Sequence, residues 1–245
     1  MRREILILLA ISLVWGAVDQ SYVHDVSRDG SSEMEKTSEL SLFSDQIDEE
    51  AYQRMKIVCD DQEFRVDCSV DAEAKTVTIT EKLVPGGYYA YSADYGFPFI
   101  TYSMVIDKIP NDRFASALSR ILVEANVTDP AGAGGSVNPI DFEDEINNRE
   151  VARILKNIEA NITYTVNFPV PVSEAKSGNA SAKISGNSVT FDVVELLEVS
   201  EPVRIRSSEI NLGYMVLIIG LIIVGALALS FFGSKPIRSA KKKKA

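Results

Sequence analysis

Apolar and polar residues alternate over several short stretches of the chain, and this period of two predicts half-buried β-strands. In the clearest stretch, Ile162, Tyr164, Val166 and Phe168 share one side and the residues between them are polar. Similar patterns predict strands within residues 22–43, 63–70, 75–83, 88–109, 184–191 and 202–208, with residues 192–199 continuing the sheet.

Turn residues separate these stretches. Asp29-Gly30 and Gly186-Asn187 are typical of two-residue hairpin turns, because these residue types tolerate a positive φ. Pro169 and Pro171 cannot donate to a sheet ladder, so they predict a strand end and a corner. Gly96-Phe97-Pro98 interrupts the alternation of residues 88–109, which favours a bulge or a broken strand.

A period near 3.6 predicts helices in three further segments. Their apolar residues fall on one face, at Ile47, Ala51, Met55 and Val58; at Phe114, Leu118, Ile121, Leu122 and Ala125; and within 142–160 at Ile146, Val151, Ile154, Leu155 and Ile158. Ser44 or Asp45 is expected to cap the first helix, and Asn111 or Asp112 the second. Helices between groups of strands predict an α+β fold with a mainly antiparallel sheet and about three helices.

The two ends of the chain carry export and membrane signals. Residues 210–234 contain no charged side chain and are long enough to cross a bilayer, which predicts one C-terminal transmembrane helix. Residues 235–245 hold six basic residues and no acid, which predicts a cytoplasmic tail. The lysine run also fits a dilysine retention signal.

Residues 1–17 have the composition of a secretory signal peptide, with two arginines, an apolar run and small residues at the end. An uncleaved signal anchor is the alternative. Both ends therefore predict the same topology. The protein is expected to be a single-pass cell-membrane protein, with residues 18–209 forming an extracytoplasmic domain. Residues 126–139 form a flexible loop within it by composition.

Charge and cysteine content narrow the function classes. Residues 18–212 carry a formal net charge of −17, so the domain lacks the basic surface that nucleic acid requires and no nucleic-acid partner is expected. Cys59 and Cys68 are the only cysteines, and an even count in an exported chain favours a disulfide; two buried thiols are the alternative. Two cysteines without a second Cys/His pair cannot close a zinc site.

Catalytic chemistry finds little support in the sequence. His24, the only histidine, falls in a predicted strand and is expected to be a surface or edge residue rather than a general base. The acids of Asp141 to Glu145 lack the spacing of an EF-hand loop, and a helix N-terminus explains them without calcium. The chain is therefore predicted not to be an enzyme and to hold no metal or cofactor. The sequons at Asn126, Asn161 and Asn179 are candidate N-glycosylation sites.

Aromatic residues gather in the strand region after residue 87. They are Tyr88, Tyr89, Tyr91, Tyr95, Phe97, Phe99 and Tyr102. Tyrosine suits surroundings that are apolar around the ring and polar at the hydroxyl, so these residues are candidates for an apolar ligand pocket or a membrane-facing surface. The other interpretation is sheet core, with tyrosines along a half-exposed face.

Short motifs at both ends of the domain carry a family resemblance. They are Asp29-Gly30-Ser31, Tyr164-x-Val166-x-Phe168-Pro169-x-Pro171-Val172, Ala175, Gly178-Asn179 and Gly186-x-x-Val189-x-Phe191. This set resembles the LppM-like domain family, although Phe191 stands where that family usually has tryptophan and no lipobox cysteine follows the signal. The resemblance implies a non-enzymatic α+β domain of the cell envelope that contacts lipids or glycolipids.

Together these observations predict a membrane-anchored extracytoplasmic domain that binds lipid or glycolipid at the outer membrane face. The alternative is a structural or accessory subunit of a cell-envelope complex, with protein partners on the domain and the span. Gly213 and Gly220 lie seven residues apart and would allow close helix packing in such a complex.

Overall fold

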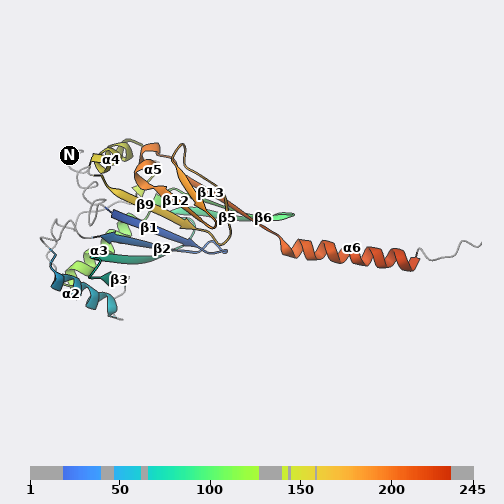
Figure 1. Ribbon diagram of the computed structural model, residues 1–245, viewed down its shortest axis with the longest axis horizontal. Helices are drawn as coiled ribbons and strands as arrows, with labels where there is room; N and C mark the ends of the chain where they lie inside the picture. The colour runs from blue at the N-terminus through green and yellow to red at the C-terminus, as the bar shows by residue number, and fades with distance from the viewer. Residues whose placement is uncertain are drawn as a thin grey trace, which may run out of the picture.

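The computed structural model describes residues 19–39, 47–61, 66–126, 140–142, 145–157 and 159–232. The predicted signal segment, nearly all of the predicted flexible loop and the basic tail lie outside these residues. The described part is an α+β domain with mainly antiparallel sheets, followed by one long apolar helix (Figure 1). The predicted fold class is confirmed, although within the described residues four helices precede the apolar one instead of about three.

The larger sheet has seven strands in the order β11-β12-β9-β1-β2-β4-β3. Its strands are β1 (Asp19–Val26), β2 (Ser32–Glu39), β3 (Asp67–Asp71), β4 (Thr76–Leu83), β9 (Asn161–Asn167), β11 (Ala182–Ser185) and β12 (Ser188–Asp192). β1 and β9 are parallel neighbours, and the other pairs of this sheet are antiparallel. Gly186-Asn187 forms the predicted two-residue turn, whereas the β1–β2 turn runs from Ser27 to Ser31.

One face of this sheet is buried, as the alternation predicts. Tyr22, Met34, Ile162, Tyr164 and Val166 are almost fully buried on that face. The opposite face is polar and partly exposed, with hydroxyl pairs such as Thr37–Thr78 and Thr165–Thr190 at 2.9 and 3.0 Å. The core of the domain therefore lies on a single side of the larger sheet.

A smaller antiparallel sheet covers part of the buried face, in the order β10-β13-β6-β5. It consists of β5 (Tyr89–Tyr95), β6 (Phe99–Ile106), β10 (Val172–Lys176) and β13 (Val203–Ile210). The prolines at 169 and 171 stand at the predicted corner, where the chain passes from β9 in the larger sheet to β10 in the smaller one. Gly96-Phe97-Pro98 is a hairpin turn between β5 and β6, so the broken strand, one of the two predicted alternatives, is confirmed and the bulge is not.

Helices cover the rest of the buried face at the end of the domain away from the long apolar helix (Figure 1). They are α2 (Glu49–Asp60), α3 (Asn111–Glu124), α4 (Glu145–Asn157) and α5 (Val193–Val199), and β7 (Lys108–Ile109) pairs with β8 (Ile140–Asp141) beside them. The side chain of Asp48 caps α2, and Pro110 stands at the N-cap of α3 without a side-chain bond, so both predicted caps are wrong. Residues 193–199, expected to be strand, are helical because Asp192 caps them and Ser200 ends them in a left-handed conformation.

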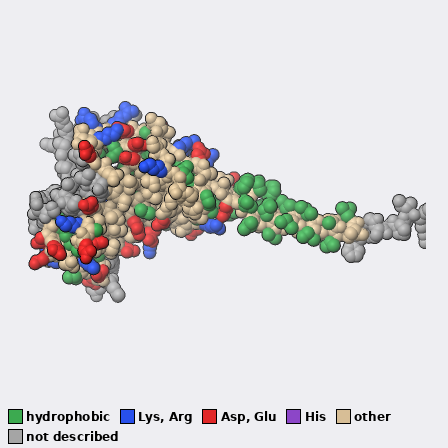
Figure 2. Space-filling view, viewed as in Figure 1, with side chains coloured by type: hydrophobic (Ala, Val, Ile, Leu, Met, Phe, Trp, Pro, Cys, Tyr) green, Lys and Arg blue, Asp and Glu red, His purple; other side chains and the backbone are tan. Residues whose placement is uncertain are grey.

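The last helix, α6 (Leu212–Phe232), is apolar along its whole length and its central part lies outside the domain core. Residues Leu212–Ser230 are long and apolar enough to cross a membrane. Figure 2 shows apolar side chains running from the end of the domain onto this helix, away from the charged surface. The predicted transmembrane helix is therefore present as a candidate span.

Cys59 and Cys68 form the predicted disulfide, which joins the last turn of α2 to β3. Replacing both cysteines by serine is expected to lower the free energy of unfolding by about 2–3 kcal/mol, because the open loop regains freedom in the unfolded chain. Chemical unfolding with and without reductant measures this. Reductant should destabilise the wild type and leave the double variant unchanged; equal stability of both proteins without reductant would contradict the prediction.

Candidate functional site

The β5–β6 hairpin extends beyond the β1–β2 turn toward α6 (Figure 1). We call Tyr95 to Phe99 the hairpin tip. Tyr95, Phe97 and Phe99 are 65%, 60% and 49% exposed, although each is a large aromatic residue. The tip is exposed because the larger sheet, which covers the rest of β5 and β6, does not reach it.

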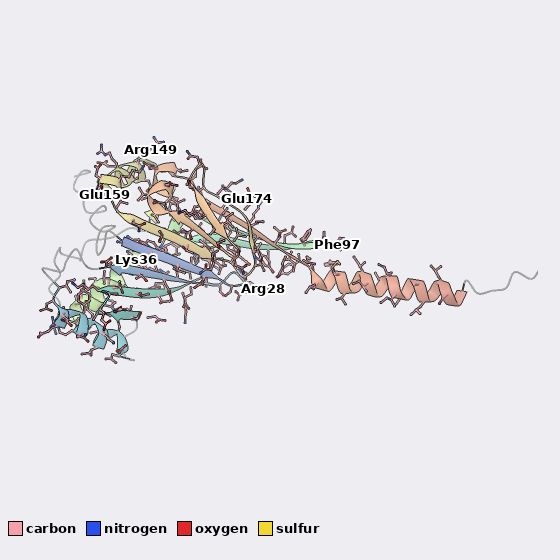
Figure 3. The ribbon with its side chains drawn as sticks, in the orientation of Figure 1. Arg28, Lys36, Phe97, Arg149, Glu159 and Glu174 are labelled. Atoms are coloured by element: carbon pink, nitrogen blue, oxygen red, sulfur yellow. A yellow bond between two sulfur atoms is a disulfide. The ribbon has the colours of Figure 1, made fainter. Side chains whose placement is uncertain are left out.

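Asn211 fastens the tip to α6. It is the only residue between β13 and α6, and it is buried. Its backbone N–H donates to the Pro98 carbonyl at 2.9 Å, and its side-chain amide donates to the Gly96 carbonyl at 3.3 Å. The Phe97 ring lies 6.2 Å from the Tyr214 ring in the first turn of α6, and Figure 3 shows Phe97 beside the start of this helix. The tip and the start of α6 therefore form one unit.

A polar cluster links the larger sheet to the same unit. Arg28, in the β1–β2 turn, forms a 2.9 Å ion pair with Glu209 of β13, which also accepts a 2.7 Å hydrogen bond from the Tyr102 hydroxyl. Tyr91 donates to the Arg28 carbonyl at 3.1 Å, and burial raises the pKa of Tyr91 and Tyr102 to about 12. Both phenols therefore stay neutral and keep their hydrogen bonds at physiological pH.

The seven predicted aromatic residues divide into an inner and an outer group. Tyr89 and Tyr102 are buried in the core, and Tyr88 lies under the Arg113 guanidinium at 5.3 Å. Tyr91 covers Gly30, whose φ of +86° and lack of a side chain leave room for the ring. Tyr95, Phe97 and Phe99 alone form an exposed surface, so the structure brings together three of the seven as a candidate contact site.

A buried polar chain, which the sequence did not reveal, crosses the space between the two sheets. His24 is fully buried in β1, so its predicted surface or edge position is wrong. Its Nδ1 lies 2.8 Å from the Tyr164 hydroxyl and its Nε2 lies 2.7 Å from the Ser32 hydroxyl. Ser32 donates to Tyr89 at 3.0 Å, and Tyr89 donates to the Gly30 carbonyl at 2.6 Å.

Burial sets the protonation of this chain, because it lowers the pKa of His24 to about 3 and so keeps the imidazole neutral. Ser32 gives its only hydrogen to Tyr89, so it accepts one from His24 Nε2. Nδ1 of the neutral ring then accepts the hydrogen bond from Tyr164. A histidine without access to solvent or a free lone pair cannot serve as a general base, so this network is structural.

Lys36 is a second buried polar group of β2. Its ammonium donates to Asn111 Oδ1 at 3.0 Å and lies 5.3 Å from the centre of the Tyr22 ring. Tyr22 also donates to Asn111 Oδ1, at 3.1 Å. Burial lowers the pKa of Lys36 to about 7, because the ammonium loses its hydration inside the domain.

A polar groove of about 580 Å³ lies at the other end of the domain, beside α4 and α5. Acids outnumber bases among its charged lining residues, but Lys156 pairs with Glu198 at 2.7 Å and Glu195 accepts the Ser181 N–H at 2.9 Å. Among the described residues, no group of three or more Asp, Glu, His or Cys is arranged to hold a metal ion. Within the described part of the chain, the groove therefore offers no evident chemistry.

The three sequon asparagines are all exposed. Asn126 follows α3, Asn161 begins β9 and Asn179 lies in the groove wall between β10 and β11. Glycosylation at these positions stays a prediction.

Comparison of the chain with protein-family models, with curated proteins and with solved structures finds no match. The resemblance to the LppM-like domain family therefore stays a prediction, and the functional argument rests on the geometry of this chain.

Proposed function

We propose that the protein is a single-pass membrane protein whose extracytoplasmic domain binds lipid or glycolipid at the outer membrane face. The single observation that carries this proposal is the exposed aromatic tip, fastened by Asn211 to the first turn of the candidate span. Exposed aromatic clusters on a soluble domain favour an apolar contact, and this one lies beside the helix that would enter the membrane.

The linkage between domain and span supports the same proposal. β13 passes into α6 through Asn211 alone, and the Arg28–Glu209 ion pair ties the larger sheet to β13. So short a connection holds the domain against the bilayer surface. Lipid is then the partner that the tip meets at the highest local concentration.

Photo-crosslinking tests the proposal directly. With the full chain in nanodiscs containing a phospholipid that carries a photoreactive headgroup, we expect labelled peptides from residues 95–99 as well as from the start of α6. Exchanging Phe97 and Phe99 for serine should reduce labelling of the tip several-fold and leave labelling of α6 unchanged. Labelling restricted to α6 in the wild type would contradict lipid binding by the domain, and copurification of a stoichiometric protein covering the tip would favour the accessory-subunit function.

A further inference from the structure

The hairpin tip lies beside the first turn of α6, where the Phe97 ring approaches the Tyr214 ring. We propose that the tip is a second membrane anchor, which inserts Tyr95, Phe97 and Phe99 at the boundary between headgroups and acyl chains and so holds the domain upright. This inference rests on the proposed function and specifies the part of the lipid that is contacted.

The length of α6 sets the depth at which the tip lies. A helix of 21 residues is about 32 Å long, close to the hydrocarbon thickness of about 30 Å. Almost the whole helix is therefore needed to cross, so its first turn lies at the hydrocarbon boundary. Phe97 contacts Tyr214 in that turn, and Phe99 pairs across the sheet with Ile210. The tip must consequently lie at the same boundary.

The composition of the tip fits this position on both faces of the hairpin. Phe99 and Ile210 project from the outer face of the smaller sheet, whereas Tyr95 and its cross-strand partner Ile100 project from the inner face. Phe97 occupies the turn between them. A hairpin end that is apolar on both sides has no face suited to water, and tyrosine and phenylalanine rings beside a span resemble the aromatic belts of membrane proteins.

Charges next to the tip indicate which lipids it prefers. Arg28 lies at the α6 end of the domain in Figure 3, and its partner Glu209 comes three residues before α6. Asp29 shares the β1–β2 turn, and Asp94 precedes Tyr95 in β5. Acids outnumber bases among these four side chains. The tip should therefore enter a zwitterionic or neutral lipid surface at least as well as an anionic one.

Tryptophan quenching by brominated lipids tests the insertion. Trp15 is the only tryptophan, so a Trp15→Phe, Phe97→Trp double variant of the full chain reports on the tip alone. In phosphatidylcholine vesicles we expect strong quenching by bromine placed near the glycerol end of the acyl chain, and several-fold weaker quenching by bromine near the methyl end. The matched control is Trp15→Phe with Val123→Trp, at an exposed site of α3 at the opposite end of the domain, and should not be quenched.

Four results would contradict the inference in whole or in part. Quenching of the tip no greater than that of the Val123→Trp control would show that the tip stays in water or under another protein. Quenching that increases when anionic phosphatidylglycerol is added would contradict the preference for neutral lipid. If the photoreactive headgroup labels the tip without bromine quenching, lipid binding stands and insertion fails; if neither occurs, both proposals fail.

Discussion

Replacing Lys36 by methionine is expected to stabilise the protein at neutral pH by about 2–4 kcal/mol. Among the residues that the structure describes, no acid pairs with the buried ammonium, and a methionine of similar length occupies the same space without losing hydration. Asn111 Oδ1 keeps the hydrogen bond from Tyr22, so the exchange leaves no unpaired acceptor. Replacing a buried polar group that destabilises the folded state is a common way to stabilise a protein.

The lowered pKa of Lys36 also determines how the free energy of unfolding changes with pH. The folded pKa of Lys36, about 7, lies below the unfolded value of 10.5, so between these values only the unfolded chain binds the proton. Wild-type stability should therefore rise as the pH increases from about 7 to about 9, and the Lys36→Met variant should lack that part of the rise. Urea unfolding of the full chain in mild detergent measures both proteins.

Lys82→Met, at an exposed position of β4, is the matched control and should change neither the stability nor its slope with pH by more than a few tenths of a kcal/mol. Loss of stability in Lys36→Met at pH 7, or a slope equal to that of the wild type, would show that Lys36 is stabilised by its surroundings.

Acidification is expected to destabilise the domain through His24. Its folded pKa of about 3 lies below the ordinary histidine value of 6.5, so between these values the unfolded chain gains a proton on this site and the folded protein does not. Stability should therefore fall as the pH drops below about 6.5, by about 3 kcal/mol at pH 4 from this residue alone. Protonation of Nδ1 would also remove its ability to accept from Tyr164.

Two variants separate this effect from general acid denaturation. His24→Gln is neutral at every pH and should show a shallower decline between about pH 6.5 and pH 4, even though it begins less stable. Tyr164→Phe keeps the histidine and should retain the steep decline, with a cost of about 1–3 kcal/mol at neutral pH from the unpaired Nδ1. Exposed carboxylates with lowered pKa, such as Glu174, contribute equally in all three proteins. Parallel declines in the wild type and His24→Gln would refute the assignment to His24.

The alternation of apolar and polar residues along the sequence predicted most of the strands. The alternation at Ile162, Tyr164 and Val166 gave the correct buried face of β9, and the two prolines after it gave the corner between the sheets. These predictions succeeded because strand periodicity and the missing N–H of proline are local properties. The parallel pairing of β1 with β9 joins segments far apart in the chain, and no local pattern contains it.

The errors also have physical causes. Residues 193–199 are rich in valine and leucine and look like strand, but Val193, Val194, Leu196 and Leu197 are all buried at helical spacing behind the Asp192 cap. His24 looked like an edge residue because its partners Tyr164 and Ser32 lie on other strands. For the candidate site, the sequence identified the aromatic region, but only the folded structure shows that Tyr95, Phe97 and Phe99 stay exposed.

The position of β1 between β9 and β2 affects how the chain folds during its synthesis. β1 is synthesised early and pairs with β2, and its other edge stays open until β9 is synthesised more than a hundred residues later. During that interval the nascent chain exposes an unpaired strand edge with buried-type residues, which is the state most prone to aggregation. Late closure of this sheet places slow, long-range pairing at the end of the folding path of the domain.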